Sequence, residues 1–259
     1  MKQQTQCTVV KIITLITFLA MVVVNALSAV LPINGITPGE VSDAYPNLFA
    51  PAGLTFSIWG LIYVLLALYT GYQLVSKNAP NELICKLSIL FSISSAANIL
   101  WIFAWHYQII PLSMALILII LVCLIWILQL ITSQALSIKE KFFIKLPFAV
   151  YLGWITVATI ANVVVLLVSL GWDGFGVLEQ TWTVLVLTVG TVIGILAGLR
   201  FKSIAYLLVF IWAYIGIIIK HTSSSGFDGQ YPAVVVAAGI CIALFVAAAV
   251  FLAVKNKNK

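Results

Sequence analysis

The chain has 259 residues, of which 63% are hydrophobic and only 8% are charged. A soluble globular domain carries roughly a quarter of charged residues, so this composition excludes a water-soluble fold. The net charge of +6 is dispersed between apolar runs rather than gathered in one block, and we expect no nucleic-acid partner.

Eight apolar runs reach the roughly 18–20 residues that a helix needs to cross a bilayer. They lie at about 11–31, 52–75, 84–106, 110–134, 146–170, 180–199, 203–219 and 232–254. The sequence therefore predicts an all-α, polytopic transmembrane helix bundle whose first partner is the lipid bilayer. The first run resembles a cleaved signal peptide in its flanks, but it is longer than the usual apolar stretch of roughly 7–15 residues, and we treat it as a retained span.

Charge fixes the expected orientation of these spans. If the N-terminus lies inside, twelve of the thirteen basic residues fall in inner segments, and only Lys220 lies outside. Five of the seven acidic residues then fall outside. Because cytoplasmic loops are enriched in Lys and Arg, we predict a multi-pass cell-membrane protein with both termini in the cytoplasm.

The first outer loop, about 32–51, is the longest connection. It contains four prolines and two glycines, which we interpret as too many for a regular helix. Loops of this length between spans are often functional, for example as a lid over a site.

Signatures of soluble enzymes are absent from the sequence. We find no phosphate-binding glycine loop, zinc spacing or nucleophile elbow, so we predict neither catalytic residues, nor a metal site, nor a required cofactor. His106 and His221 fall at outer membrane edges; each is an axial haem ligand or, as we expect, a hydrated interfacial side chain. No Asp or Glu lies within a predicted span, which argues against a proton-driven pump but leaves backbone-coordinated ions open.

Aromatic residues and amides instead form stripes on three predicted spans. Residues three or four apart share one face of a helix. The stripes are Trp59 and Tyr63; Asn98, Trp101 and Trp105; and Tyr151, Trp154, Ala158 and Asn162. They lie at similar depth, so we predict one cavity with aromatic walls and amides that orient a ligand.

Two other interpretations of these residues stay open. Trp and Tyr commonly form interfacial belts, which we predict for Trp172, Trp182 and Trp212. Intramembrane Asn commonly forms hydrogen bonds between helices.

Small residues at every fourth position predict packing seams in the sixth and eighth spans. They are Gly190, Gly194 and Gly198 in the sixth span, and Ala233, Ala237 and Cys241 in the eighth.

Three motifs resemble the tryptophan-rich sensory protein family (TspO/MBR, the translocator or peripheral benzodiazepine receptor family). They are the stretch from Tyr45-Pro46 through Ala50-Pro51 to Trp59 and Tyr63, the Asn98-x-x-Trp101 motif, and the stretch from Pro147 through Trp154 and Ala158 to Asn162. The usual loop tryptophan of the family is Leu48 here.

This resemblance implies a five-helix bundle with a pocket under the first loop, which binds porphyrin-type or haem-type tetrapyrroles. Trp59, Tyr63, Asn98, Trp101, Trp154 and Ala158 would line the pocket, and Pro46 and Pro51 would belong to its lid. The resemblance covers about 11–170 and implies a TspO/MBR-like bundle at 1–175 and three additional helices at 176–259.

The sequence therefore predicts a membrane sensor or carrier that binds a flat hydrophobic small molecule, most simply a porphyrin. The alternative is a secondary transporter of a small solute, in which the last three spans complete the transport path. An enzyme is not predicted, and a homodimer is left open.

Overall fold

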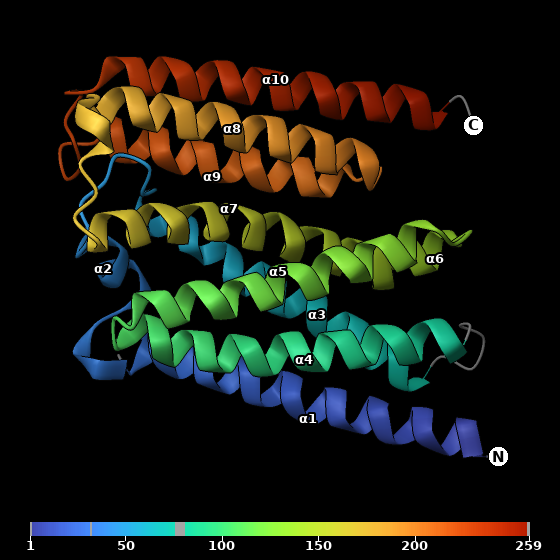
Figure 1. Ribbon diagram of the computed structural model, residues 1–259. Helices are drawn as coiled ribbons and strands as arrows, with labels where there is room; N and C mark the ends of the chain where they lie inside the picture. Colours follow the sequence, from blue (N-terminus) through green and yellow to red (C-terminus); the bar gives the residue numbers. More distant parts are fainter. Residues whose placement is uncertain (1, 32, 76–80, 258–259) are drawn as a thin grey trace. The chain divides into compact units, whose positions relative to one another are not determined.

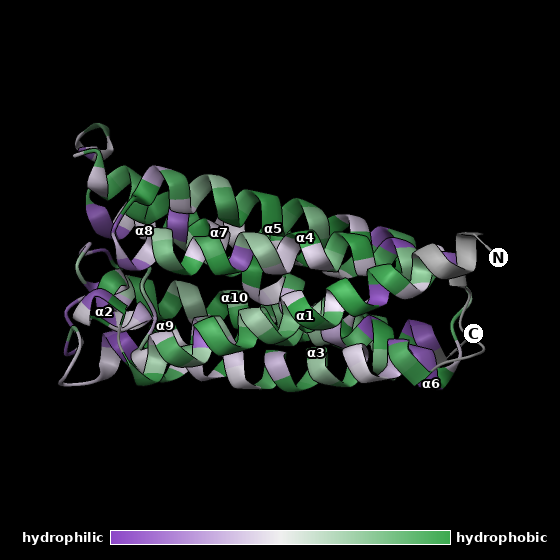
Figure 2. Ribbon diagram, turned by 90° about the horizontal axis from the view of Figure 1, so that it is seen from below, coloured by the Kyte–Doolittle hydropathy of each residue, from purple (hydrophilic) through white to green (hydrophobic). Residues whose placement is uncertain are grey.

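The computed structural model describes residues 2–31, 33–75 and 81–257 (Figure 1). Within these residues all regular structure is helical, and eight helices are long and apolar enough to cross a membrane. The predicted all-α, polytopic bundle with eight spans is therefore confirmed. Figure 2 shows hydrophobic residues along these helices and hydrophilic residues mainly in the loops and at helix ends.

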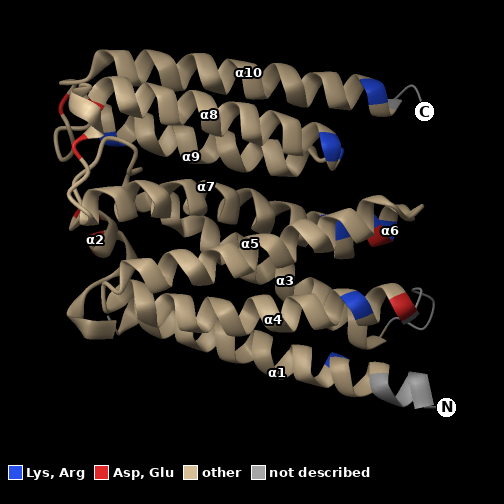
Figure 3. Cartoon of the chain, in the orientation of Figure 1, with Lys and Arg blue, Asp and Glu red and all other residues tan. Residues whose placement is uncertain are grey.

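The spans follow the predicted apolar runs closely. They are α1 (Lys2–Val30), α3 (Ile58–Val75), α4 (Asn81–His106), α5 (Ile110–Thr132), α7 (Leu146–Ser169), α8 (Glu179–Arg200), α9 (Ile204–Thr222) and α10 (Pro232–Lys257). Among the described residues, Asp and Glu lie in loops or near helix ends (Figure 3). Pro32, Lys77 and Lys259, which enter the loop and charge predictions above, lie outside the described residues.

Short helical elements connect the spans. They are η1 (Ile33–Gly35), α2 (Pro38–Asp43), η2 (Gly53–Ser57), α6 (Ile138–Glu140), the π-helical turn η3 (Lys141–Lys145) and η4 (Gly174–Gly176). The expectation that the first outer loop contains no regular helix is wrong for α2. This helix begins at Pro38. Proline is favoured in the first turn of a helix, because backbone N–H groups there make no intrahelical hydrogen bond and the lack of one costs nothing.

The turn η3 precedes Pro147 in a continuous helical run from α6 to α7. A proline inside such a run removes one backbone hydrogen bond and clashes with the preceding turn, which a wider π-helical turn relieves. The extra residue in this turn rotates the following residues about the helix axis, so it determines which side chains of α7 lie on each face of the helix.

Contacts divide the chain into two compact units. Unit 1 comprises Met1–Pro38 and Trp59–Leu152, and unit 2 comprises Gly39–Ile58 and Gly153–Lys259. The first outer loop from Gly39 onward thus belongs with the C-terminal helices, and α7 contributes to both units. The predicted domain boundary between residues 175 and 176 rests on family resemblance and not on contacts within the chain, and it stays a prediction.

Polar side chains connect α1 to α4 in unit 1. Thr14 Oγ1 lies 2.9 Å from Ser92 Oγ and 3.0 Å from the carbonyl oxygen of Ser88. Further along both helices, towards their C-terminal ends, Asn25 Nδ2 donates to Asn98 Oδ1 at 2.7 Å. The nearly constant difference in residue number shows that α1 and α4 run parallel, joined by intramembrane hydrogen bonds.

The glycine ridge of α8 packs within unit 2. Gly190 faces the Tyr214 hydroxyl, Gly194 faces the rings of Phe210 and Phe245, and Gly198 faces Leu207. All three glycines are buried. The predicted packing seam is confirmed, and its partners are α9 and α10 of the same chain.

The predicted seam of α10 is correct at Cys241, which is buried, but wrong at Ala233. Ala233 is exposed, whereas the buried face carries Val234, Ala238, Cys241 and Phe245. Phe245 lies on this face with its ring centroid 5.0 Å from that of Phe210. A large ring that fills the space over Gly194 thus sets the buried face of α10, rather than the row of small residues that begins at Ala233.

We expect Gly194→Ala to destabilise the protein by about 1–3 kcal/mol, the usual cost of overpacking. A Cβ at this position would lie 2.7 Å from Phe245 Cε1 and 3.0 Å from Phe210 Cε1. Gly239→Ala on α10 is the control, because no atom lies within 4 Å of its added Cβ and alanine favours the helix. Thermal unfolding in detergent measures both. Equal midpoints for the two variants would contradict the close packing of α8.

Candidate functional site

Three aromatic side chains surround Trp59 in unit 1. The Trp59 ring stacks on Tyr63 with centroids 5.5 Å apart and an interplanar angle of 16°. It lies 6.4 Å from Trp101 and meets Tyr151 edge-on at 6.1 Å. These distances are typical of favourable aromatic pairs. The structure thus brings together residues from α3, α4 and α7, and we call Trp59, Tyr63, Trp101 and Tyr151 the Trp59 cluster.

Asn98 borders this cluster and is fully buried. Its Oδ1 accepts from Asn25, and its Nδ2 donates to the Tyr151 hydroxyl across 3.4 Å. The side chain therefore connects α1, α4 and α7, as intramembrane asparagines often do. Its role in orienting a ligand stays a prediction.

Two donors in the Trp59 cluster have no hydrogen-bond partner among the described residues. They are the hydroxyl of Tyr63 and Nε1 of Trp101, and both atoms are buried. By contrast, Trp105 Nε1 donates to the carbonyl oxygen of Pro38 at 3.1 Å. A buried donor without a partner costs free energy, which a hydrogen-bond acceptor placed beside either group would offset.

The remaining predicted site residues belong to unit 2. Trp154 is buried and meets Phe56 edge-on at 5.9 Å. Asn162 Nδ2 lies 3.4 Å from the carbonyl oxygen of Ala158, one turn earlier on α7. Pro46 is exposed and Pro51 is half-buried. Their participation in one pocket with the Trp59 cluster stays a prediction.

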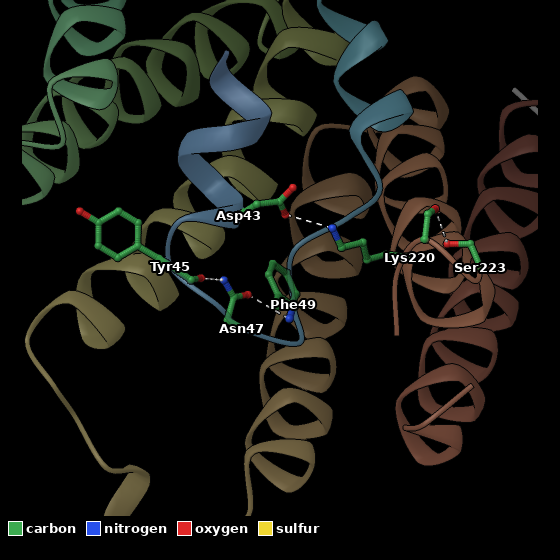
Figure 4. A network of polar contacts seen from close by, with 7 residues as sticks. Asp43, Tyr45, Asn47, Phe49, Lys220 and Ser223 are labelled. Atoms are coloured by element: carbon green, nitrogen blue, oxygen red, sulfur yellow. Dashed lines mark hydrogen bonds and ion pairs between the residues drawn. The ribbon is translucent and has the colours of Figure 1, made fainter. Parts of the chain in front are cut away.

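The first outer loop is held in place by side chains of unit 2 (Figure 4). Asp43 Oδ1 pairs with Lys220 Nζ at 3.0 Å. Within the loop, Asn47 Nδ2 donates to the carbonyl oxygen of Tyr45 at 2.8 Å, while its Oδ1 accepts from the Phe49 N–H at 3.0 Å. The loop thus has a defined conformation and is not a free tether.

His221 adds a buried contact to this loop. Its Nε2 lies 2.8 Å from the carbonyl oxygen of Leu48, and because a carbonyl only accepts, Nε2 carries the proton. His106 likewise bonds the carbonyl oxygen of Ile102 through Nδ1 at 2.7 Å. Both side chains are fully buried, so the expectation of hydrated interfacial histidines is wrong.

Among the described residues, no group of three His, Cys, Asp or Glu could hold a metal ion.

A groove of about 760 Å³ lies between α7 and α8 in unit 2, and we call it the α7–α8 groove. Its volume falls in the usual range of small-molecule sites. The walls come from α7 residues 160–168 and α8 residues 179–189. The end of the groove beside the first outer loop is bordered by Pro46–Phe49 and the Trp172–Gly174 turn. The groove includes two of the tryptophans for which we predicted only an interfacial belt, Trp172 and Trp182.

Trp172 and Trp182 form what we call the tryptophan rim of this groove, and backbone geometry fixes their positions. Trp182 Nε1 donates to the carbonyl oxygen of Gly174 at 2.6 Å, and its ring meets Trp172 edge-on at 4.7 Å. Gly174 has a φ of +66°, and a Cβ there would lie 2.7 Å from Trp182 Nε1. Only glycine accommodates both the left-handed backbone and this close approach.

Sequence reasoning missed two residues that shape these sites. Asn25 is a polar residue inside an apolar run, as Asn98 is, and the same signal was available for it. Leu48 gave no such signal, because its contribution is the carbonyl group that accepts from His221. A backbone acceptor is common to all residues and leaves no mark in a sequence.

The chain matches a known protein family over most of its length. The family model described as TSPO-like protein matches residues 11–251. This match extends across all eight spans, beyond the first five that carry the motifs. No curated protein and no solved structure matches the chain.

We expect His221→Phe to lower the free energy of unfolding by about 1–3 kcal/mol, because it leaves the buried carbonyl group of Leu48 without a donor. Phenylalanine keeps a ring beside Phe227 and Tyr231, which lie 4.7 and 5.8 Å from the imidazole. The variant therefore isolates the hydrogen bond from ring packing. Thermal unfolding and protease cleavage within residues 39–52 measure the effect.

Thr222→Ala is the control for this substitution, because Thr222 is exposed on the same turn of α9. It should leave both the unfolding midpoint and the cleavage rate close to those of the parent. If His221→Phe also matches the parent in both measurements, the histidine does not hold the loop.

Proposed function

The chain belongs to the TSPO-like protein family, and on that premise we propose that it binds a flat hydrophobic molecule in the membrane, most simply a porphyrin-type tetrapyrrole. Family membership indicates a multi-pass membrane protein that binds or transports a ligand. The class of ligand is the part that we propose.

The Trp59 cluster is the observation that carries this proposal. Trp59, Tyr63, Trp101 and Tyr151 give flat apolar walls within one unit. A planar ring against such walls gains apolar burial and about 0.5–1.5 kcal/mol for each favourable aromatic pair. Trp154, Ala158 and Asn162, with Pro46 and Pro51, are further predicted contacts.

The unpartnered donors of the cluster support a ligand that carries acceptors. The Tyr63 hydroxyl and Trp101 Nε1 are both buried without a partner among the described residues. The carboxylates at the edge of a porphyrin accept hydrogen bonds from such groups, and bonds to charged acceptors are stronger than neutral ones. A purely hydrocarbon ligand would leave both donors unpaired.

A secondary transporter is the second candidate. The helices α8, α9 and α10 would then complete a transport path for a small solute. The described spans carry Asp and Glu only near their ends (Figure 3), which supports a binding protein over an ion-coupled carrier. Saturable, ion-gradient-dependent uptake of a water-soluble solute into proteoliposomes would decide for the transporter.

We further propose that both termini lie in the cytoplasm of a cell-membrane protein, on the strength of the basic inner segments. In a background with the four native cysteines replaced by alanine, Ser224→Cys should react with an impermeant maleimide added outside intact cells. Gln134→Cys should react only after permeabilisation. Both positions are exposed in loops. The opposite labelling pattern would reverse the orientation.

For the ligand, we expect Trp59→Ala to weaken binding of protoporphyrin by at least several-fold, since Trp59 contacts the other three rings of its cluster. Quenching of tryptophan fluorescence on titration measures the affinity. Trp126→Ala is the matched control, because Trp126 is 56% exposed on α5. Trp172 is unsuitable as a control, because it lines the α7–α8 groove.

Tyr63→Phe makes the same experiment more specific. It removes a buried hydroxyl without a partner, so the ligand-free protein should be as stable as the parent or slightly more stable. Binding of protoporphyrin should nevertheless weaken, because a carboxylate of the ligand loses the protein hydroxyl that would donate to it. Unchanged affinity in both Trp59→Ala and Tyr63→Phe would remove the Trp59 cluster as the site. Failure of the parent to bind protoporphyrin would remove this ligand class.

A further inference from the structure

We propose that the α7–α8 groove is a second binding site, which takes a cationic amphiphile: a small molecule with an apolar body and an amine or quaternary ammonium head. The site lies wholly in unit 2 and does not depend on the tetrapyrrole proposed for the Trp59 cluster. Its chemistry follows from three features of the groove, namely apolar walls, acidic groups and an aromatic rim.

The walls of the groove suit an elongated apolar body. On α7 the lining residues follow the helical period, with Ile160, Val164 and Leu167 along one face. Val186 and Val189 line the opposite side, on α8. From Ile160 to Val168 the α7 wall is roughly 12 Å long, at about 1.5 Å per residue. This length fits a short chain or a few fused rings.

Charge distinguishes the end of the groove beside the first outer loop. Asp173 and Glu179 are among the lining residues, and both are exposed. Among the described residues that line the groove, none is Lys, Arg or His. Lys220, on α9, pairs with Asp43 and does not line the groove. A ligand that enters from this end therefore meets two carboxylates with no lining cation beside them, which favours a positive head group.

The tryptophan rim favours the same charge. Trp172 and Trp182 lie beside the two carboxylates in the lining, and indole faces attract ammonium groups. The hydrogen bond from Trp182 to Gly174 holds its ring in a fixed orientation. An aromatic wall that is positioned in advance reduces the entropy lost when a ligand binds.

The same features disfavour other occupants. A tetrapyrrole carries carboxylates, which Asp173 and Glu179 would repel, so this groove and the Trp59 cluster select opposite charges. A zwitterionic phospholipid has no net charge and would place its phosphate near the two acids. A neutral lipid would gain from the walls but not from the charged end. A preference for the anionic or the neutral head group in the test below would indicate an anionic or a neutral occupant instead.

Three pyrene probes with the same apolar body and different heads test the proposal. They are pyrenebutylamine, pyrenebutanol and pyrenebutyrate, titrated into the full-length protein in zwitterionic nanodiscs, with empty nanodiscs as the background. Energy transfer from tryptophan to pyrene reports binding. The amine should bind about three- to tenfold more tightly than the alcohol, since a unit charge near two carboxylates gains this order of affinity, and pyrenebutyrate should bind most weakly.

Variants locate the effect in the groove. Asp173→Asn and Glu179→Gln should each reduce the preference for the amine by about two- to threefold, and together they should abolish it. Asp173 caps η4 by accepting from the Phe175 N–H at 2.9 Å, and asparagine keeps an oxygen for that bond. Asp228→Asn is the matched control, because Asp228 is exposed in the loop that joins α9 to α10 at the same end of unit 2.

Val186→Phe should weaken binding of all three probes, because it fills the groove between its walls. The charge variants carry the test even if this variant fails to fold. An amine preference that survives the double charge variant, or that Asp228→Asn reduces equally, would overturn the proposal. Equal affinity for amine and alcohol in the parent would leave a neutral lipid as the occupant. None of these results depends on protoporphyrin binding.

Discussion

Backbone polar groups inside a bilayer have no water to bond with, and the rest of this structure depends on that constraint. Helices satisfy it within each span, so eight apolar runs become eight helices. The same constraint acts on polar side chains, which must find partners on neighbouring helices. Asn25 and Asn98 pair across α1 and α4, and the Tyr214 hydroxyl donates to the carbonyl oxygen of Leu187 on α8. These bonds fix which helices are neighbours.

Several buried polar atoms have no hydrogen-bond partner among the described residues, and two of them belong to the Trp59 cluster. Tyr151 of the same cluster and the neighbouring Asn98 are hydrogen-bonded to each other, whereas the Tyr63 hydroxyl and Trp101 Nε1 are not bonded to any described residue. Paired groups hold helices together, whereas an unpaired buried donor would gain a hydrogen bond from a ligand acceptor. The α7–α8 groove differs in kind, because its polar groups are acidic and exposed at one end of an apolar surface. One chain thus offers two chemically distinct environments.

The sequence by itself determined the eight spans, because the hydrophobicity of about twenty consecutive residues decides whether a segment can cross a bilayer. It also predicted the glycine ridge of α8 and the aromatic residues of the Trp59 cluster. Helical phase placed Trp59 and Tyr63 on one face of α3, and Asn98 and Trp101 on one face of α4. The structure brings these two faces together. The predicted family was also correct.

Tertiary structure decided what depends on partners distant in sequence. His221 is buried rather than hydrated because the carbonyl group of Leu48 reaches it from the first outer loop. The buried face of α10 follows Phe245 and not Ala233, because a ring fills the space above Gly194. Trp172 and Trp182 line a groove only because the Gly174 turn brings them together beside α7. Such contacts depend on the packing of several elements, which local hydrophobicity and helical phase do not specify.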